Sequence, residues 1–171
     1  DVSSGVELTS ALALNARDII FSGPGKTNEE LTLAIAHADR VTLLLDSFGE
    51  LSRLKALVSE VCPPHPVRVG IRLTTNPNGL WRKFGIVPDQ LMAFWNQVKE
   101  VPGIAFKELQ FHSSWNLTPD RQLEFIELLG TVLSRMPDRF NRSIEFIDIG
   151  GGYWPGEGEW LQFAGTEEGI R

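Results

Sequence analysis

The sequence has little cysteine, no long apolar run and no excess of basic charge, and each of these lacks excludes a class of protein. Its single cysteine, Cys62, cannot form an internal disulfide or a multi-cysteine zinc site. No run approaches the roughly 20 apolar residues of a membrane-spanning helix. With 16 Lys and Arg against 22 Asp and Glu, the net charge of −6 gives no footprint for nucleic acid. The 42% of hydrophobic residues are enough for the core of one globular domain.

Five short apolar, β-branched runs predict buried strands. They lie at residues 18–22, 41–46, 67–73, 108–113 and 144–150. The segments between them have helical periodicity, in which apolar residues share one face. The four predicted apolar faces are formed by Leu31, Ile35 and Ala38; by Leu51, Leu54 and Val58; by Leu91, Phe94, Trp95 and Val98; and by Leu123, Ile126, Leu129 and Leu133. Strands that alternate with helices predict βα units and a parallel sheet.

Helix starts are marked by two kinds of signal. A hydroxyl followed three residues later by a glutamate fits the capping box, in which each side chain bonds the other residue's backbone N–H. A proline at the first helical position costs no hydrogen bond. The capping boxes are predicted at Ser4 and Glu7, Thr27 and Glu30, and Ser47 and Glu50, and the prolines are Pro88 and Pro119.

Polar residues on one face of the predicted strands favour a barrel over an open, doubly wound sheet. Parallel strands covered on both faces are usually apolar throughout. Here Arg68, Gly70 and Arg72 alternate with apolar residues, and so do Glu108, Gln110 and His112. A polar inner face fits a barrel that lines a ligand site. We therefore predict an α/β fold, a (β/α)8 barrel present here as a partial barrel of about six βα units.

Several polar residues fall at or near the carboxyl ends of the predicted strands. Because barrel enzymes carry their active sites at that end, these residues are functional candidates. They are Ser22, Asp46, Arg72, His112 and Asp148. Strand ends are also generally more polar than strand centres, which is the competing interpretation. Arg72 and His112 are the stronger candidates, because both are predicted to point into the barrel.

Three consecutive glycines, Gly150, Gly151 and Gly152, follow the last predicted strand. Glycines at such a place can turn several backbone N–H groups toward one anion and let a phosphate approach the backbone closely. A flexible loop is the alternative interpretation of this triplet.

His112 has several possible roles: a general base, a metal ligand, a ring that stacks on a cofactor, or an interior histidine with a structural hydrogen bond. His37 and His65 lie in a predicted helix and a proline-rich loop, away from any common cluster. The sequence therefore argues against a metal site.

One motif points to another class of protein. Ser22-Gly-Pro-Gly-Lys26-Thr27 follows a strand and opens a helix, as a phosphate-binding P-loop does. The complete pattern needs a glycine where Ile20 stands, so a nucleotide hydrolase, with Asp148 as its magnesium ligand, is the weaker alternative. Lys26 is assigned to the start of the helix, and a Lys26→Ala change is expected to have little effect.

Read together, these segments resemble the fold-type III pyridoxal-phosphate decarboxylases, the family of diaminopimelate, ornithine and arginine decarboxylases. The SGPGK and DSFGEL forms are most similar to the bacterial diaminopimelate decarboxylase branch. The matching stretches occur in the family's order; they are residues 1–8, 19–31, 46–54, 70–77, 83–86, 110–114 and 147–156.

The resemblance implies a barrel of the alanine racemase and decarboxylase type, pyridoxal 5'-phosphate as cofactor, and a cytoplasmic homodimer that decarboxylates a basic or diamino acid. It also implies that His112 stacks on the pyridine ring and that Gly150, Gly151 and Gly152 hold the phosphate. Asp1 and Arg72 are expected among the polar groups around the cofactor.

Some family positions are changed or lie outside the sequence. Trp115 stands where the family has a phosphate-binding serine. The lysine that forms the Schiff base is expected before Asp1, and none of the five lysines matches it; the last strand and a C-terminal β-domain are expected after Arg171. Residues 1–171 are then the central part of a pyridoxal-phosphate-binding barrel domain, inactive alone. A non-catalytic homologue that binds or regulates a partner is the alternative.

Overall fold

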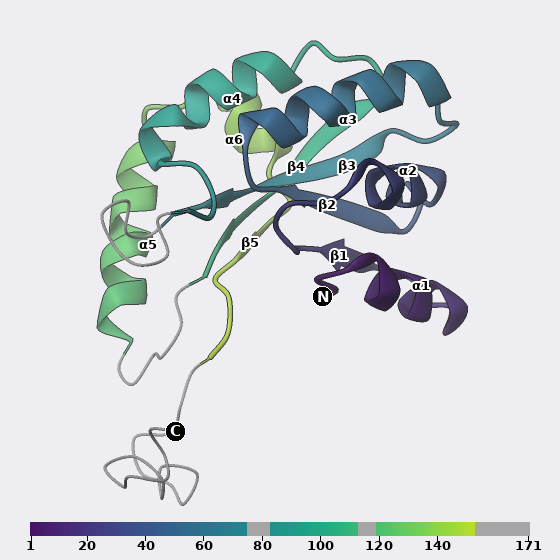
Figure 1. Cartoon of the computed structure of the whole chain (residues 1–171). Coiled ribbons are helices and arrows are strands. Elements are labelled where there is room, and N and C mark those ends of the chain that lie inside the picture. Colours follow the sequence, from purple (N-terminus) through teal and green to yellow (C-terminus); the bar gives the residue numbers. More distant parts are fainter. Residues whose placement is uncertain (75–82, 113–118, 153–171) are drawn as a thin grey trace, which may run out of the picture.

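A computed structural model describes residues 1–74, 83–112 and 119–152 of the chain (Figure 1). Helices and strands alternate through these residues. The elements are α1 (Gly5–Ala13), β1 (Ile19–Phe21), α2 (Asn28–Ala36), β2 (Val41–Leu45), α3 (Phe48–Val61), β3 (Val67–Leu73), the 3-10 helix η1 (Pro88–Gln90), α4 (Leu91–Val98), β4 (Ile104–Phe111), α5 (Asp120–Leu133), α6 (Asp138–Ser143) and β5 (Phe146–Asp148). No helix in these ranges is long and apolar enough to cross a membrane.

The five strands form one parallel sheet in the order β1-β2-β3-β4-β5, so each strand pairs with the next one along the chain. The sheet curls, and the helices cover its convex side (Figure 1). Val2 adds an isolated parallel bridge beside Phe21, which places the residues before α1 next to β1. These features confirm the predicted partial barrel and a strand in each of the five predicted regions, although the described residues contain five strands and no sixth unit.

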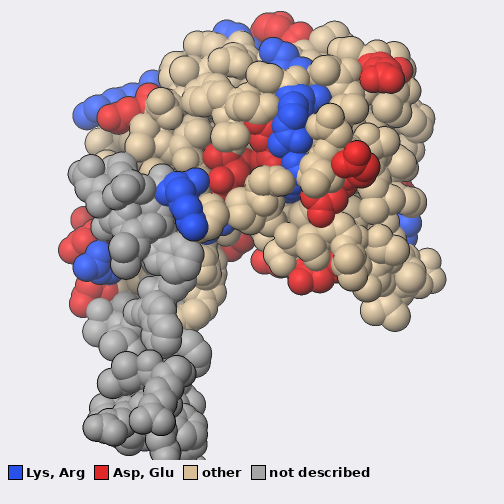
Figure 2. Space-filling model, viewed as in Figure 1, with Lys and Arg blue, Asp and Glu red and all other residues tan. Residues whose placement is uncertain are grey.

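The side chains of each inner strand alternate between the two faces of the sheet. Val67, Val69 and Ile71 are fully buried in the apolar core beneath the helices. The intervening residues of β3, with those of β4 and β5, face the concave side, where acidic and basic groups surround a hollow (Figure 2). The predicted polar inner face is therefore confirmed.

Strand β4 begins four residues earlier than the sequence predicts, at Ile104 rather than Glu108. A β-bulge explains the difference. The register shifts after Val69, so that Phe106 pairs with Val69 and Glu108 pairs with Gly70, and Lys107 is the extra residue. The bulge interrupts the alternation of apolar and polar residues, and the pattern therefore hid the first half of the strand.

The predicted apolar face of α5 is wrong in part. Leu129 is buried, but Leu123 and Ile126 are 54% and 43% exposed. The helix packs instead through Phe125, whose ring centroid lies 4.5 Å from that of Phe111 on β4. The apolar part of α5 is wider than one stripe, and the sequence could not show which part meets the sheet.

Strand β5, predicted to be buried, is also partly exposed, with Ile147 at 41%.

The helix caps agree with the prediction at one of three places. Thr27 and Glu30 form a complete capping box. Ser4 and Ser47 accept the expected N–H bonds from Glu7 and Glu50. The two glutamates, however, accept from the residues before the caps, Ser3 and Asp46. Of the prolines, Pro88 opens η1, whereas Pro119 lies one residue before the first residue of α5.

Candidate functional site

A cavity of about 390 Å³ opens on the concave side, at the carboxyl ends of the strands. Five residues that the sequence singled out lie in its wall: Asp1, Arg72, His112, Gly150 and Gly151. Asp148 and Ser22, predicted as polar strand ends, are also in the wall, whereas Gly152 and Asp46 are not. The sequence did not predict Ser3, Gly23, Pro24 and Gln110 as members of the cavity. Of these, only Gln110 carried a signal, because it shares the inner face of β4 with His112.

Arg72, at the end of β3, supplies the cation of the cavity. Its Nη1 atom lies 3.9 Å from Oδ1 of Asp46, at the end of the neighbouring β2. Its guanidinium also lies over the ring of Phe84, 5.0 Å from the centroid. Burial lowers the pKa of Arg72, and the charges of Asp46 and Asp148 oppose that change. Arginine remains cationic under such conditions, so the cavity keeps a fixed positive charge.

His112, directly after β4, supplies a neutral aromatic ring. Burial and the nearby Arg72 cation lower its pKa, and the Asp148 carboxylate only partly opposes them. The backbone N–H of Gly151 donates to Nδ1 at 3.3 Å. Because Nδ1 is the acceptor, the ring proton lies on Nε2. The ring is therefore uncharged at neutral pH and is oriented by the backbone after β5.

The glycines after β5 adopt the backbone conformation that glycine favours. Gly150 and Gly152 have φ of +73° and +78°. The N–H of Gly150 donates to Oδ1 of Asp148 at 2.7 Å. With the bond from Gly151 to His112, two of the predicted anion-nest amides already have partners within the chain. A Cβ built on Gly151 meets nothing within 4 Å, so space is open beside this residue.

A second polar layer lies below the cavity, inside the curl of the sheet. Glu108 is 0% exposed, and both of its carboxyl oxygens lack a hydrogen-bond partner. Gly70 on β3 makes room for it, since a Cβ on Gly70 would lie 2.6 Å from Cβ of Glu108. Burial, with the negative charge of Asp148, raises the pKa of Glu108 to about 8. This carboxyl is therefore mostly protonated at neutral pH.

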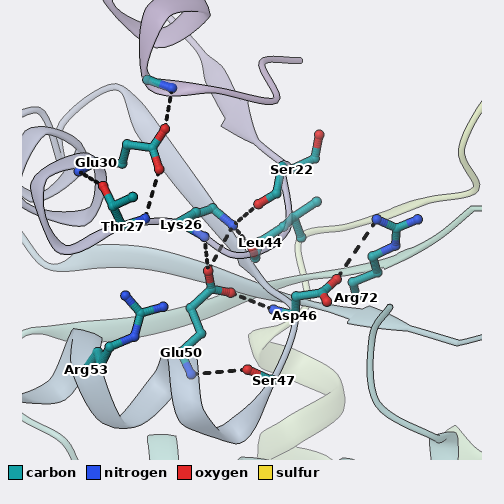
Figure 3. A network of polar contacts seen from close by, with 12 residues as sticks. Ser22, Lys26, Thr27, Glu30, Leu44, Asp46, Ser47, Glu50, Arg53 and Arg72 are labelled. Atoms are coloured by element: carbon teal, nitrogen blue, oxygen red, sulfur yellow. Dashed lines mark hydrogen bonds and ion pairs between the residues drawn. The ribbon is translucent and has the colours of Figure 1, made fainter. Parts of the chain in front are cut away.

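The P-loop interpretation of Lys26 is wrong, because the side chain turns into the protein (Figure 3). Lys26 is 2% exposed, and its Nζ donates to the carbonyl oxygens of Gly23 and Leu44. It also forms an ion pair with Glu50. The same contacts remove the reason for expecting little effect of Lys26→Ala, since the lysine ties the start of α2 to β2 and α3.

The chemistry of the cavity suits an anionic, aromatic cofactor. It combines a neutral ring at His112, a cation at Arg72 and open space beside Gly151. Within the described ranges, no group of three or more His, Cys, Asp and Glu residues could hold a metal ion. Trp115, which the resemblance aligns with a phosphate-binding serine, lies outside the described residues.

Comparison with known proteins places the chain among decarboxylases. Residues 1–163 match the family described as "Pyridoxal-dependent decarboxylase, pyridoxal binding domain". The chain is 27% identical over 161 residues to 2-((L-alanin-3-ylcarbamoyl)methyl)-2-hydroxybutanedioate decarboxylase of Staphylococcus aureus (strain NCTC 8325 / PS 47), covering 89% of the chain and 40% of that protein. It is 28% identical over 167 residues to a decarboxylase of the L-glutamyl BtrI acyl-carrier protein from Niallia circulans, covering 87% and 38%. The chain thus spans about two fifths of these relatives.

Solved structures show the same fold. Diaminopimelate decarboxylase from Helicobacter pylori, in complex with L-lysine, superposes with a TM-score of 0.69 at 20% identity, covering 92% of this chain and 43% of that one. The AQ1208 protein from Aquifex aeolicus gives a TM-score of 0.71 at 22% identity, covering 89% and 36%.

Proposed function

Because the chain belongs to the pyridoxal-dependent decarboxylases, we propose that the protein containing it removes the α-carboxylate of a basic or diamino acid, as diaminopimelate decarboxylase does. One observation carries the proposal. Residues from before α1, from β3, from the end of β4 and from the segment after β5 meet in one cavity, and they are the residues that the family resemblance assigns to the cofactor.

Pyridoxal 5'-phosphate, when bound, supplies the electron sink for the carbanion left by carbon dioxide. The proposed roles of the chain are to bind and orient this cofactor. His112, neutral and with its Nδ1 held by Gly151, offers a flat face to the pyridine ring. Open space beside Gly151 leaves the backbone there accessible to the phosphate, and Gly150 and Gly152 supply the positive-φ turns on either side of it. Arg72 remains cationic and, with Asp1, completes the polar wall.

Several finer points belong to the same proposal. The lysine that binds the cofactor covalently is proposed to lie outside these 171 residues, on a strand that precedes Asp1 in the barrel. The substrate is proposed to be a free amino acid, and the enzyme a cytoplasmic homodimer. These points rest on membership of the family. The two relatives named above are only 27% and 28% identical to this chain, so their own substrates are not carried over to it.

The test uses the whole protein that contains this chain. Binding of pyridoxal 5'-phosphate is followed by absorbance, and release of carbon dioxide is measured with diaminopimelate, lysine, ornithine and arginine. We expect binding, and turnover of at least one of these amino acids. His112→Ala should weaken cofactor binding at least about tenfold, as loss of a stacked ring does. His65→Ala is the control, because His65 lies in the exposed loop before β3.

Two results would contradict the proposal in different ways. Cofactor binding without carbon dioxide release from any amino acid would favour a non-catalytic homologue. Equal cofactor binding by the His112→Ala and wild-type proteins would remove His112 from the site, while leaving the family assignment intact.

A further inference from the structure

The end of β2 is held by two side chains to which the proposed function gives no role. Lys26 comes from the loop between β1 and α2, and Glu50 from the first turn of α3 (Figure 3). The side chains are 0% and 2% exposed, and Lys26 Nζ lies 3.7 Å from Glu50 Oε1. A buried ion pair stabilises a fold little more than apolar residues of the same volume, because both charges lose their water. Stability alone therefore does not explain the pair.

Both side chains bind the backbone at the carboxyl end of β2. Lys26 Nζ donates to the carbonyl oxygens of Leu44 and Gly23, at 2.5 and 2.7 Å. Glu50 accepts the N–H of Asp46 through Oε2 at 2.8 Å and the N–H of Lys26 through Oε1 at 3.0 Å. Hydrogen bonds to charged groups are about twice as strong as neutral ones. The backbone that carries Asp46 is therefore held by one cation and one anion.

Asp46 in turn faces the cavity cation. Its Oδ1 atom is buried and has no hydrogen-bond partner, and it lies 3.9 Å from Nη1 of Arg72. That distance is longer than a hydrogen bond, so the contact itself orients neither side chain strongly. The position of the Asp46 carboxylate then relies on its backbone, whose N–H Glu50 holds.

We propose that the buried Lys26–Glu50 pair is a positioning device for the candidate site, which aims the Asp46 carboxylate at Arg72. This inference rests on the proposed function only in taking Arg72 as a cofactor-site residue. Neither Lys26 nor Glu50 lies in the cavity wall, and Lys26 contacts the wall through the backbone carbonyl of Gly23; both residues therefore act through the backbone and are positioning residues.

The charges around Lys26 indicate what happens to Asp46 when Glu50 loses its charge. Burial lowers the pKa of Lys26, and the charge of Glu50, followed by that of Asp46, opposes this change. When Glu50 becomes neutral, Asp46 is the anion that acts most strongly on Lys26. We expect its carboxylate to turn toward the lysine and away from Arg72, because an unpaired buried cation is costly. Glu50→Gln should therefore act on Arg72 in the same way as Asp46→Asn.

The experiment is a double-mutant cycle on cofactor affinity in the whole protein. The Kd for pyridoxal 5'-phosphate is measured for wild type, Glu50→Gln, Asp46→Asn and the double variant. We expect each single change to raise Kd by about fivefold or more, and the double variant to be no worse than either single one. Glu50→Gln and His112→Ala should instead combine additively. Additive effects of Glu50→Gln and Asp46→Asn, or an unchanged Kd in folded Glu50→Gln, would overturn the proposal.

Two further variants separate positioning from folding. Lys26→Met with Glu50→Gln removes both buried charges and leaves neither unpaired; it should fold and raise Kd less than Glu50→Gln alone, because no ammonium draws Asp46 away from Arg72. The matched control is the partly exposed ion pair between Lys107 on β4 and Glu145 before β5, with exposures of 29% and 53%. Lys107→Met with Glu145→Gln should leave Kd unchanged. A raised Kd in this control would mean that any lost ion pair weakens binding.

A second measurement does not need the cofactor. The hydrogen exchange rate of the Arg72 guanidinium N–H groups, followed by NMR, responds to the negative charge of Asp46, whose Oδ1 lies 3.9 Å from Nη1. Glu50→Gln and Asp46→Asn should accelerate this exchange by the same factor, and an unchanged rate in Glu50→Gln refutes the positioning role. A wild-type protein that binds no pyridoxal 5'-phosphate contradicts the proposed function, whereas the exchange rates still decide the positioning role.

Discussion

His112 occupies the space that a side chain at Gly150 would need. A Cβ atom built on Gly150 would lie 2.6 Å from Nδ1 of His112 and 2.9 Å from the carbonyl oxygen of Phe111. The glycine also has φ of +73°, a conformation that other residues rarely adopt. The contact between the end of β4 and the segment after β5 thus depends on the absence of a side chain at this one position.

Gly150→Ala should therefore lower the free energy of unfolding, by about 1–3 kcal/mol, through backbone strain and the clash with His112. Gly151→Ala is the matched control, because its Cβ would meet nothing within 4 Å. Urea denaturation of the two variants measures the difference. Equal losses in both variants would show that the contact with β4 is not what requires glycine at position 150.

The stability of the protein should fall as pH rises through the neutral range, because of Glu108. Its pKa in the folded state is about 8, against an ordinary 4.5, so the folded state holds a proton that the unfolded state has lost. The stabilisation is complete below about pH 4.5 and is lost between there and about pH 8, at up to about 1.4 kcal/mol per pH unit.

Glu108→Gln should remove this part of the pH dependence. Urea denaturation between pH 5 and 9 of wild type and Glu108→Gln isolates the effect, because the other titrating groups cancel in the difference. Glu145→Gln, at an exposed carboxyl, should keep the wild-type slope. Parallel curves for wild type and Glu108→Gln would mean that Glu108 ionises at its ordinary pH.

Lys26→Ala should be among the most destabilising single changes in the chain. It removes a buried side chain and leaves the Glu50 carboxylate at 2% exposure without its cation. Breaking a buried pair in this way costs about 3–5 kcal/mol. Lys99→Ala, at an exposed position after α4, should stay within about 0.5 kcal/mol of wild type. Thermal and urea unfolding measure both variants, and a small loss at Lys26 would contradict its buried position.

The packing of α5 gives a direct comparison of two large apolar residues. Phe125 is 4% exposed and Leu123 is 54% exposed. Phe125→Ala should cost about 3–5 kcal/mol, because it leaves a cavity beside Phe111. Leu123→Ala should cost less than about 1 kcal/mol. If the free energies of unfolding were reversed, α5 would face the sheet as the sequence predicts rather than as the structure has it.

The strands and their inner face were predictable because the alternation of apolar and polar residues along each strand is a local property of the sequence. Val67, Val69 and Ile71 alternate with polar residues, and that period of two is enough to place Arg72 on the concave side. His112 could be assigned to the cavity for the same reason. The parallel order followed from the helices between the strands, since parallel neighbours need such connections.

The rest depends on contacts between segments far apart in the sequence. Nothing near Lys26 signals that its amine is buried, because its partners come from β2 and α3. Glu50 fits a capping box, yet it bonds Asp46 and Lys26 instead of closing the box. The unpaired carboxyl of Glu108 likewise becomes evident only when Gly70 is seen beside it. Contacts between buried polar residues that are far apart in the sequence produce no periodic pattern from which they could be predicted.

The bulge at Lys107 makes β4 unusual in its tolerance of changes in length. Because Lys107 is an extra residue between two correctly paired halves, deleting it would join Phe106 to Glu108 and keep each half in register with β3. Removing any one residue between Glu108 and Phe111 would instead turn His112 from the concave to the convex side. In this barrel, β4 can therefore be shortened at Lys107 without moving the cavity residues. A deletion farther along the strand would place the side chains that follow it on the opposite face of the sheet.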